Sequence, residues 1–327
     1  MQTVSVIICC YNGSKFINQC FSCLLNQTYK NIEAIFIDDG STDQSYMIAK
    51  SYIEKFSEAG MKLICLTQEN KGAGGAAALG LTIATGKYIC CYDIDDILYS
   101  NSLELQVSFL EQNPSYGIVR TNGYKVIQDI NKIEKKSLFI NNKKEKSKTN
   151  IFEDILLGKT NNWAGSYMVT SKALWNVYKD HKIIESRYGQ NLQILLAVAY
   201  NNKSGFIDIP LMEYRFNPQS FTNQNRSLTN QLKNLQGFYE LRRNILDKLK
   251  LNAPDLIRKL DITYLYLYLD LALHLNNEKL FIQYYNELSK IESPEYLYKY
   301  HFFKIKRNIV LSTYYRTLNY INKHFNN

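Results

Sequence analysis

The sequence lacks several features that would point to other classes of protein. No uninterrupted apolar stretch reaches the roughly 20 residues that a helix needs to span a bilayer. No basic segment precedes the short apolar run near its start, so we expect no signal peptide. The four histidines all lie after residue 180, which excludes histidine chemistry from the first half of the chain.

Cysteine is absent after residue 91, and the seven cysteines before it form no metal-binding pattern. Cys20 and Cys23 make one Cys-x-x-Cys pair, but no second Cys or His pair accompanies it, which argues against a zinc or redox site. We therefore expect packed, reduced thiols, as in a cytoplasmic protein.

The formal net charge is +9, with an isoelectric point near 9.0. A basic balance favours nucleic acid, anionic lipid or phosphorylated ligands as partners. Since the sequence contains no nucleic-acid-binding motif, we expect no nucleic-acid partner.

Near-continuous apolar runs at residues 4–10, 32–37 and 87–92 are typical of parallel strands covered on both faces. Each run is followed by a helical stretch, so the pattern predicts repeated βα units and a parallel sheet. In open α/β sheets, ligands bind outside the carboxyl ends of the strands. Tyr11, Asp38, Asp39, Asp93 and Asp95 all fall at such ends.

The segment Asp93-Ile94-Asp95-Asp96 places three carboxylates directly after an apolar strand. Neighbouring carboxylates repel each other and are costly to desolvate unless a cation joins them. Hard oxygen ligands suit Mg²⁺ or Mn²⁺, which usually bind phosphates as well. The alternative is a plain polar turn in which Asp96 caps a helix over residues 97–110.

Together these motifs resemble family 2 glycosyltransferases of the GT-A fold. The resemblance covers residues 1–222 and is carried by the acidic segment together with five others: Val4–Ile8, Tyr11-Asn12, Asn26–Tyr29, Asp38–Asp43 and Asn70–Gly72. It implies an α/β GT-A domain over residues 1–222, with a nucleotide-binding half (1–112) and an acceptor half (113–222). Residues 223–327 would form an α-helical C-terminal extension.

The resemblance also implies how a nucleotide sugar is held. Tyr11 would stack near uracil, and Asp39 would accept a hydrogen bond from its N3–H. Asp93 would contact the ribose, and Asp95, with Asp93 beside it, would hold the metal ion. The remaining residues implied at the nucleotide-sugar site are Cys9, Asn12, Asp38, Lys71 and Gly72.

The chain departs from the family at the position of the catalytic base. The implied Gly-Glu-Asp motif reads Gly189-Gln190-Asn191 here, as in a recurring bacterial branch of the family. An amide does not act as a base near neutral pH, and the nearest upstream carboxylates, Glu185 and Asp180, are the alternative candidates. Either the amides grip hydroxyls of the donor or the acceptor, or Asn191 only caps or packs its helix.

Four residues are candidates for the acceptor site: Trp163, Gly165, Gln190 and Arg215. Trp163 either stacks on an acceptor sugar or packs as a core aromatic. The family's Ala-Arg-Asn segment is replaced by Ala76-Ala77-Ala78. Positive charge for the diphosphate would then come from Lys71 or Arg215.

After residue 222 the pattern predicts helices over residues 231–249, 253–275, 278–291 and 294–325. Residues 264–269 alternate like a strand, but Leu and Ala continue to Leu275, which favours helix. The last predicted helix is basic and aromatic, with Glu295 as its only acid. This composition is typical either of an anionic membrane surface element or of a packed helix with a solvated basic face.

The function implied is inverting, metal-dependent transfer of a hexosyl group from a UDP-linked sugar. The acceptor would be a glycan or lipid-linked oligosaccharide in bacterial surface polysaccharide synthesis, at the inner face of the plasma membrane. One alternative is a non-catalytic sugar-nucleotide-binding protein, because the base is missing. A nucleotidyltransferase is a second alternative, but it would need a glycine-rich basic phosphate loop, which residues 10–14 do not provide.

Overall fold

A computed structural model describes residues 2–128, 134–160, 163–216 and 227–325. The chain divides into two compact units. Unit 1 contains residues 1–225 and 240–251, and unit 2 contains residues 226–239 and 252–327. The boundary expected at residue 222 falls in the range 217–226, outside the described residues.

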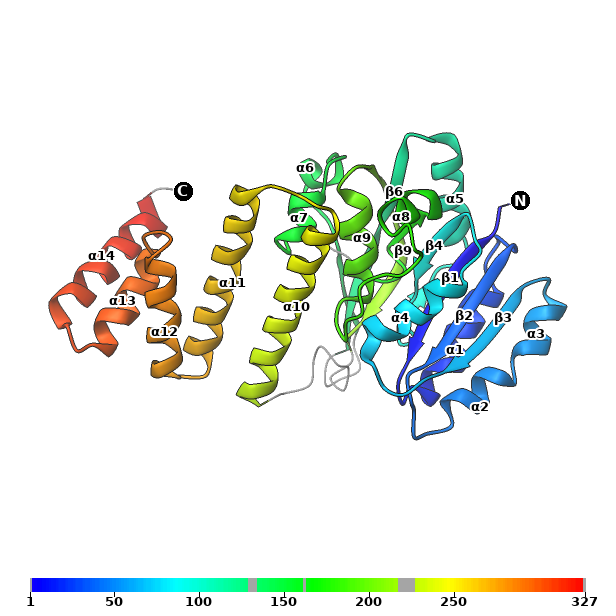
Figure 1. The fold of residues 1–327 in the computed structure, drawn as a ribbon, viewed down its shortest axis with the longest axis horizontal. Helices are drawn as coiled ribbons and strands as arrows, with labels where there is room; N and C mark the ends of the chain where they lie inside the picture. The colour runs from blue at the N-terminus through cyan, green and yellow to red at the C-terminus, as the bar shows by residue number, and fades with distance from the viewer. Residues whose placement is uncertain (1, 129–133, 161–162, 217–226, 326–327) are drawn as a thin grey trace. The chain divides into compact units, whose positions relative to one another are not determined.

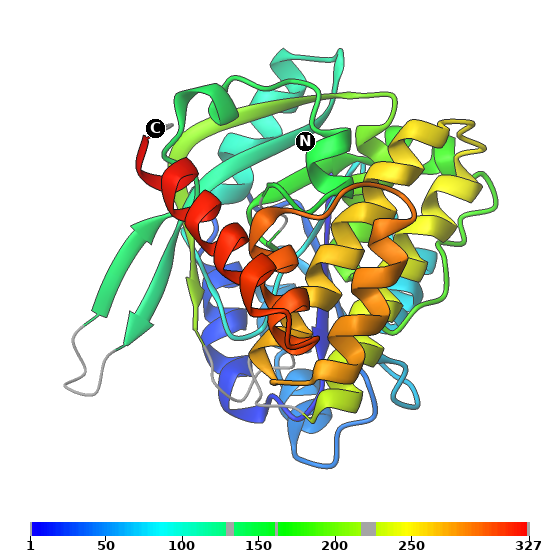
Figure 2. The ribbon, with the colours of Figure 1, turned by 90° about the vertical axis from the view of Figure 1, so that its left-hand side faces the viewer.

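Unit 1 is built on a nine-stranded mixed sheet with the order β3-β2-β1-β4-β8-β6-β9-β5, in which β7 pairs with β6 (Figure 1). The strands are β1 (Val4–Cys10), β2 (Ile32–Asp38), β3 (Lys62–Thr67), β4 (Tyr88–Cys91), β5 (Ile97–Leu98), β6 (Tyr116–Gln128), β7 (Glu134–Leu138), β8 (Tyr167–Thr170) and β9 (Lys203–Arg215). The first four strands are parallel, β8 runs antiparallel to β4 and β6, and Figure 2 shows β6 and β7 as a hairpin.

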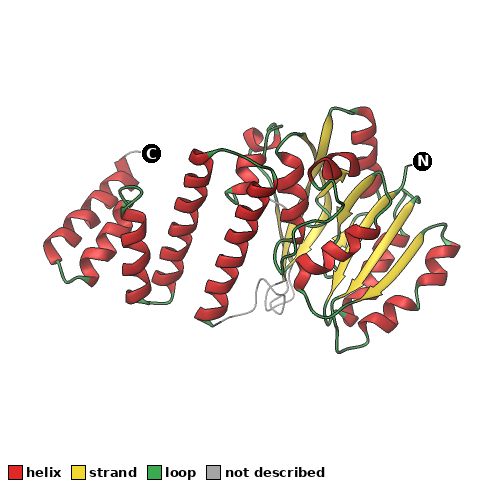
Figure 3. Ribbon diagram, in the orientation of Figure 1, coloured by secondary structure: helices red, strands yellow, loops and turns green. Residues whose placement is uncertain are grey.

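Helices cover both faces of this sheet (Figure 3). They are α1 (Ser14–Leu25), α2 (Ser45–Lys50), α3 (Ile53–Glu58), α4 (Gly72–Ile83), α5 (Ser102–Gln112), α6 (Lys143–Lys146), α7 (Phe152–Leu156), α8 (Ser171–Val177) and α9 (Gln190–Ala199). Phe21 of α1 anchors one face through edge-to-face contacts with Phe36 and Phe56. On the other face α4 lies close to β1, so that a Cβ on Gly80 would come within 2.9 Å of Ile7. Coverage on both faces explains why the apolar runs of β1 and β2 hardly alternate.

The seven cysteines of this unit are free thiols, and four of them are buried. Cys20 lies in the core beside Ile17 and Phe21, where it packs as a small apolar side chain.

Unit 2 is helical and contains α11 (Pro254–His274), α12 (Glu278–Ser289), α13 (Tyr296–Ile305) and α14 (Ile309–Phe325). The helix α10 (Leu228–Lys248) contributes residues to both units. Residues 264–269 are helical, as predicted, because Tyr264, Tyr268 and Ala272 recur at the spacing of one buried helix face.

The single helix predicted over residues 294–325 was wrong, because the chain breaks between α13 and α14. Arg307 adopts a positive φ of 60°, which ends α13. The Asn308 side chain then accepts a hydrogen bond from the Leu311 amide in the first turn of α14.

The fold requires a glycine in β9 where α5 crosses it. A Cβ on Gly205 would lie 2.1 Å from the ring of Phe109. We expect Gly205→Ala to lower the free energy of unfolding by about 1–3 kcal/mol through overpacking, measured by urea denaturation. The same change in a Phe109→Leu background should cost much less, since the smaller side chain leaves room. Equal costs in the two backgrounds would contradict this account.

Candidate functional site

Hydrogen bonds join the loop after β1 to the loop after β2 at the carboxyl edge of the sheet. The Asn12 side-chain oxygen accepts from the Thr42 amide at 2.8 Å, and the Ser41 hydroxyl accepts from the Asn12 amide at 2.9 Å. Asn12 adopts a positive φ of 51°, which asparagine tolerates better than most residues. Tyr11, beside it, remains 56% exposed and offers a flat aromatic surface at this edge.

Asp39 is 2% exposed and organises the turn before α4. It accepts hydrogen bonds from the amides of Lys71 and Gly72, both at 2.8 Å, and from the Gln68 side chain at 2.7 Å. Its Oδ2 atom has a single donor and keeps capacity for another. Among the described residues, Oδ1 of the neighbouring Asp38 is buried without a partner. Both carboxylates therefore retain accepting capacity at the carboxyl end of β2.

The backbone segment that leads into α9 packs against the first turn of α4. Gly72 has a φ of 78°, and a Cβ there would lie 2.6 Å from the Arg187 carbonyl oxygen. A Cβ on Gly74 would lie 2.4 Å from the Tyr188 carbonyl oxygen. Only glycines let the two stretches of backbone approach this closely.

Arg187 is a residue that the sequence analysis missed. Its guanidinium donates to the Asn70 carbonyl at 3.0 Å and to the Asn70 side-chain oxygen at 2.7 Å. It thereby joins the start of α9 to the turn that Asp39 holds. The glycines at 72 and 74 were the available signal, because missing side chains at a helix start indicate that another backbone packs there.

The acidic segment after β4 contains three carboxylates in different surroundings. Burial, and then repulsion by Asp95, raises the pKa of Asp93 to about 7, and a hydrogen bond donated by Gln190 opposes that rise. Burial, and then the nearby groups Cys91, Asp93 and Asp39, raises the pKa of the Cys9 thiol well above its usual value.

Asp96 does not cap a helix over residues 97–110, so that alternative was wrong. Residues 97–98 form β5, and α5 begins only at Ser102. Asp96 is fully buried, and its Oδ1 accepts from the Arg215 amide at 3.0 Å. Burial and then the charges of Asp93 and Asp95 raise its pKa well above its usual value. Asp96 thus ties the acidic turn to the end of β9.

The donor set suits a divalent cation that is shared with a ligand. Among the described residues, no group of three or more His, Cys, Asp or Glu side chains is arranged to hold a metal ion by itself. Mg²⁺ is commonly held by one or two carboxylates together with substrate phosphates. Asp93 and Asp95 fit this pattern, because their mutual repulsion is relieved when a cation binds.

The two amides at the start of α9 lie against this acidic segment. Gln190 donates a hydrogen bond from Nε2 to Oδ1 of Asp93. The hydroxyl of Tyr167 donates to Oδ1 of Asn191 at 2.8 Å. The structure thus brings Asn191 and Gln190 to the same edge of the sheet as Asp93. Glu185, by contrast, is exposed and has no recorded bond to any of these residues.

The remaining candidates flank the acidic turn. The ring of Trp163 stacks on the ring of Tyr214, with centroids 5.2 Å apart. The ring centroid of Phe139 lies 4.0 Å from that of Trp163. Gly165 has a φ of 82° and donates its amide to the Cys91 carbonyl at 2.7 Å. Arg215 pairs with Glu213 at 3.0 Å. Trp163 therefore makes packing contacts as a core aromatic does.

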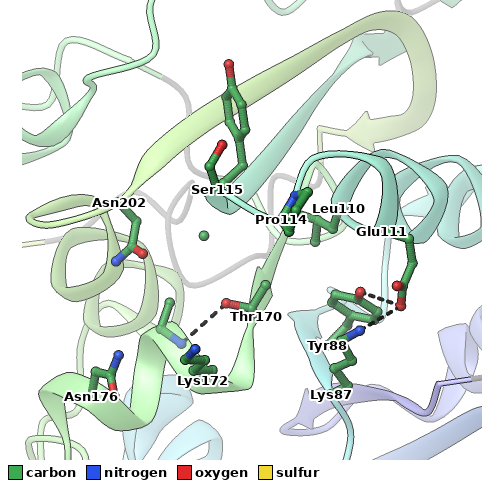
Figure 4. Close-up of a pocket in the computed structure, with 13 residues that line it drawn as sticks. Lys87, Tyr88, Leu110, Glu111, Pro114, Ser115, Thr170, Lys172, Asn176 and Asn202 are labelled. Carbon is green, nitrogen blue, oxygen red and sulfur yellow. Dashed lines mark hydrogen bonds and ion pairs between the residues drawn. The ribbon is translucent and has the colours of Figure 1, made fainter.

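One pocket lies away from this edge, near the start of β4 (Figure 4). It has a volume of about 360 Å³, and its polar lining includes Lys87, Lys172, Asn176 and Asn202. None of the candidate site residues lines it.

A model of the family described as "Glycosyl transferase family 2" matches residues 5–173, slightly more than half of the chain. An uncharacterized glycosyltransferase of Rickettsia prowazekii is 37% identical over 124 residues, which cover 38% of this chain and 37% of that protein. Glycosyltransferase GlyG of Streptococcus pneumoniae is 39% identical over 104 residues, which cover 32% of this chain and 33% of that protein.

Solved structures resemble the chain over nearly its whole length. The structure of S. aureus TarS 1–349 in complex with UDP-GlcNAc matches with a TM-score of 0.60 at 17% identity, covering 97% of this chain and 92% of that one. Mannosyltransferase PcManGT from Pyrobaculum calidifontis, in complex with GDP-Man and Mn²⁺, matches with a TM-score of 0.50 at 14% identity, covering 98% and 87%. The predicted GT-A-type α/β fold with a helical C-terminal region is confirmed.

The contact between Arg187 and Asn70 generates a local prediction. Arg187→Ala removes both hydrogen bonds to Asn70, so we expect amide exchange at Lys71 and Gly72 to accelerate about three- to tenfold. Hydrogen–deuterium exchange resolves this change from global unfolding, which urea denaturation monitors. Lys182→Ala removes an exposed cation from the same stretch and should leave the turn unchanged. Equal exchange in both variants would show that the Arg187 contact does not hold the turn.

Proposed function

The chain belongs to glycosyl transferase family 2, and we propose that it transfers a hexosyl group, with inversion, from a UDP-linked sugar to a hydroxyl of a glycan acceptor. One observation carries the proposal. An exposed tyrosine, the Asp39 turn and the Asp93–Asp95 pair lie together at the carboxyl edge of the parallel strands, where α/β sheets bind ligands.

The donor site follows from these groups. The exposed ring of Tyr11 supports stacking on uracil, and the accepting capacity of Asp39 supports a bond from the uracil N3–H. Lys71, exposed beside Asp39, offers positive charge for the diphosphate, and Arg187 extends the basic surface of the same turn. The fold likeness to a TarS structure with UDP-GlcNAc makes a UDP sugar the first donor to test.

Asp93 and Asp95 would hold Mn²⁺ or Mg²⁺. When bound, the cation would act as a Lewis acid that stabilises the leaving diphosphate. Gln190 assists from the protein side, because its donated hydrogen bond orients the Asp93 carboxylate. Asp96 holds the turn in place through its bond to β9.

The step that the site supports least is removal of the acceptor proton. Asn191 stands at the base position and its oxygen already accepts from Tyr167, while Glu185 is exposed and unconnected to the site. In this proposal the acceptor hydroxyl loses its proton late in the reaction, to solvent or to phosphate. A non-catalytic sugar-nucleotide-binding protein is the alternative that this missing base favours.

A panel of UDP-GlcNAc, UDP-glucose, UDP-galactose and GDP-mannose with Mn²⁺ tests the proposed function without the acceptor. We expect the wild type to bind one UDP sugar in a metal-dependent way and to hydrolyse it slowly. Asp95→Asn should abolish the metal-dependent part of binding while the fold stays intact. Asp247→Asn changes an exposed acid of α10 outside the candidate site, and it is the matched control that should behave as wild type.

Three outcomes separate the candidate functions. Metal-dependent binding with UDP release supports the transferase. Binding without any UDP release, even with a glycan acceptor present, favours the non-catalytic binding protein. Unchanged metal-dependent affinity in Asp95→Asn would rule out Asp95 as the ligand.

The setting we propose is bacterial surface polysaccharide synthesis at the inner face of the plasma membrane, with a glycan or lipid-linked acceptor. None of the described helices combines the length and apolar content needed to cross a bilayer.

The corner between α13 and α14 exposes apolar side chains, with Ile309 78% and Val310 80% exposed. No Asp or Glu follows Glu295 in the sequence, and the cations near this corner include Lys304, Lys306, Arg307 and Arg316. Exposed apolar groups among cations suit an anionic lipid surface.

We expect the full chain to sediment with vesicles that contain anionic lipid and not with neutral vesicles. The variant Ile309→Asn with Val310→Asn should lose about tenfold or more in vesicle affinity, because it removes the apolar part of the contact. Ile209→Asn changes an isoleucine in β9 that is 47% exposed and lies outside the corner, and it serves as the control. Failure of the wild type to bind anionic vesicles at low salt would leave the corner with a structural role only.

A further inference from the structure

The first two residues of α9, Gln190 and Asn191, each have a side-chain amide with two polar ends. Only one end of each makes a recorded hydrogen bond within the described part of the protein. Gln190 uses its Nε2 group to donate to Asp93, and Asn191 uses its Oδ1 atom to accept from Tyr167. Both side chains remain partly exposed. Among the described residues, neither the Oε1 atom of Gln190 nor the Nδ2 group of Asn191 has a recorded hydrogen bond.

The protein partners fix which end of each amide stays available. Asp93 presents carboxylate oxygens, so the end of Gln190 that faces it is the NH₂ group. The hydroxyl of Tyr167 donates to Oδ1 of Asn191, which leaves the Nδ2 group of Asn191 without a protein partner among the described residues. The available ends are therefore a carbonyl oxygen on Gln190 and an NH₂ group on Asn191.

One acceptor and one donor on consecutive residues match a pair of neighbouring hydroxyls, since each hydroxyl can donate or accept. We propose that Gln190 and Asn191 form a neutral clamp that binds two hydroxyls of the sugar carried by the nucleotide. The inference rests on the proposed function. It assigns the amides to the donor sugar because Gln190 contacts Asp93, the residue proposed to hold the nucleotide.

Charge explains why amides occupy these positions. A carboxylate at residue 190 would face Asp93 directly, which would lose a hydrogen bond and add repulsion. A carboxylate at residue 191 would still accept from Tyr167 but would offer no donor to the sugar. A general base at residue 191 would therefore supply only acceptors, and the clamp would lose its donor.

The test of the clamp is how much more tightly the protein binds a UDP sugar than it binds UDP alone. Dissociation constants for UDP and for UDP-GlcNAc, UDP-glucose and UDP-galactose are measured with Mn²⁺ by calorimetry, without acceptor. We expect Asn191→Asp and Asn191→Ala to keep UDP affinity within about threefold and to weaken the preferred UDP sugar about tenfold, as loss of one hydrogen bond predicts. Tyr167→Phe, which frees the Asn191 amide to rotate, should weaken the same UDP sugar by a smaller factor.

A deoxy analogue and a matched variant sharpen the test. Removing the hydroxyl that Asn191 binds should cost wild type about tenfold and Asn191→Ala almost nothing. Asn176→Asp makes the same chemical change at an exposed position outside the site and should leave both affinities unchanged. Thermal melting confirms that each variant is folded.

The outcomes distinguish this inference from the proposed function. Equal loss of UDP and UDP-sugar affinity in the Asn191 variants overturns the clamp, as does no loss of either. A wild type that binds UDP but gains nothing from any sugar overturns the clamp while the nucleotide site stands. A wild type that binds neither UDP nor any nucleotide sugar overturns both.

Discussion

Burial of β1 and β2 on both faces is the constraint on which the rest of the protein depends. A charged group in such a sheet must be satisfied by donors from the protein or by a ligand. At the amino end, Glu33 is satisfied internally, because it accepts from the Ser5 hydroxyl and from both the amide and the hydroxyl of Thr85. At the carboxyl end, Asp38 and Asp96 each keep a buried oxygen without a partner among the described residues. Glu33 is therefore a structural carboxylate, whereas Asp38 keeps accepting capacity at the edge of the sheet where the ligand site is proposed.

The glycines of α4 connect the two halves of the site. Because Gly72 and Gly74 carry no side chain, the backbone of residues 186–189 can lie directly on the start of α4. Arg187 then reaches Asn70, and Gln190, the first residue of α9, contacts Asp93 of the acidic segment. Glycine in a helix carries an entropic cost, but here it lets the backbone of residues 186–189 lie against the turn that is proposed to hold the nucleotide.

The amides of α9 change the electrostatics of the acidic turn. Asp93 already has a raised pKa through burial and the charge of Asp95. A neutral donor from Gln190 stabilises the ionised form of Asp93, which is the form that binds a cation. In a buried site, replacing a nearby carboxylate by an amide removes repulsion and supplies a hydrogen bond at once. The absence of a carboxylate at Asn191 is therefore consistent with a site adapted to neutral groups.

The sequence by itself determined three of the parallel strands (β1, β2 and β4), the acidic residues at their ends, the family and the helical C-terminal region, but it did not show β3. These follow from local periodicity and from motifs only a few residues long, which a single sequence displays directly. It did not determine that Asp96 binds the Arg215 amide, that Arg187 reaches Asn70 or that Gln190 faces Asp93. These contacts join residues 119, 117 and 97 positions apart. Periodicity carries no information on which distant segments meet, and only the packing of α4, α9 and β9 around the sheet decided it.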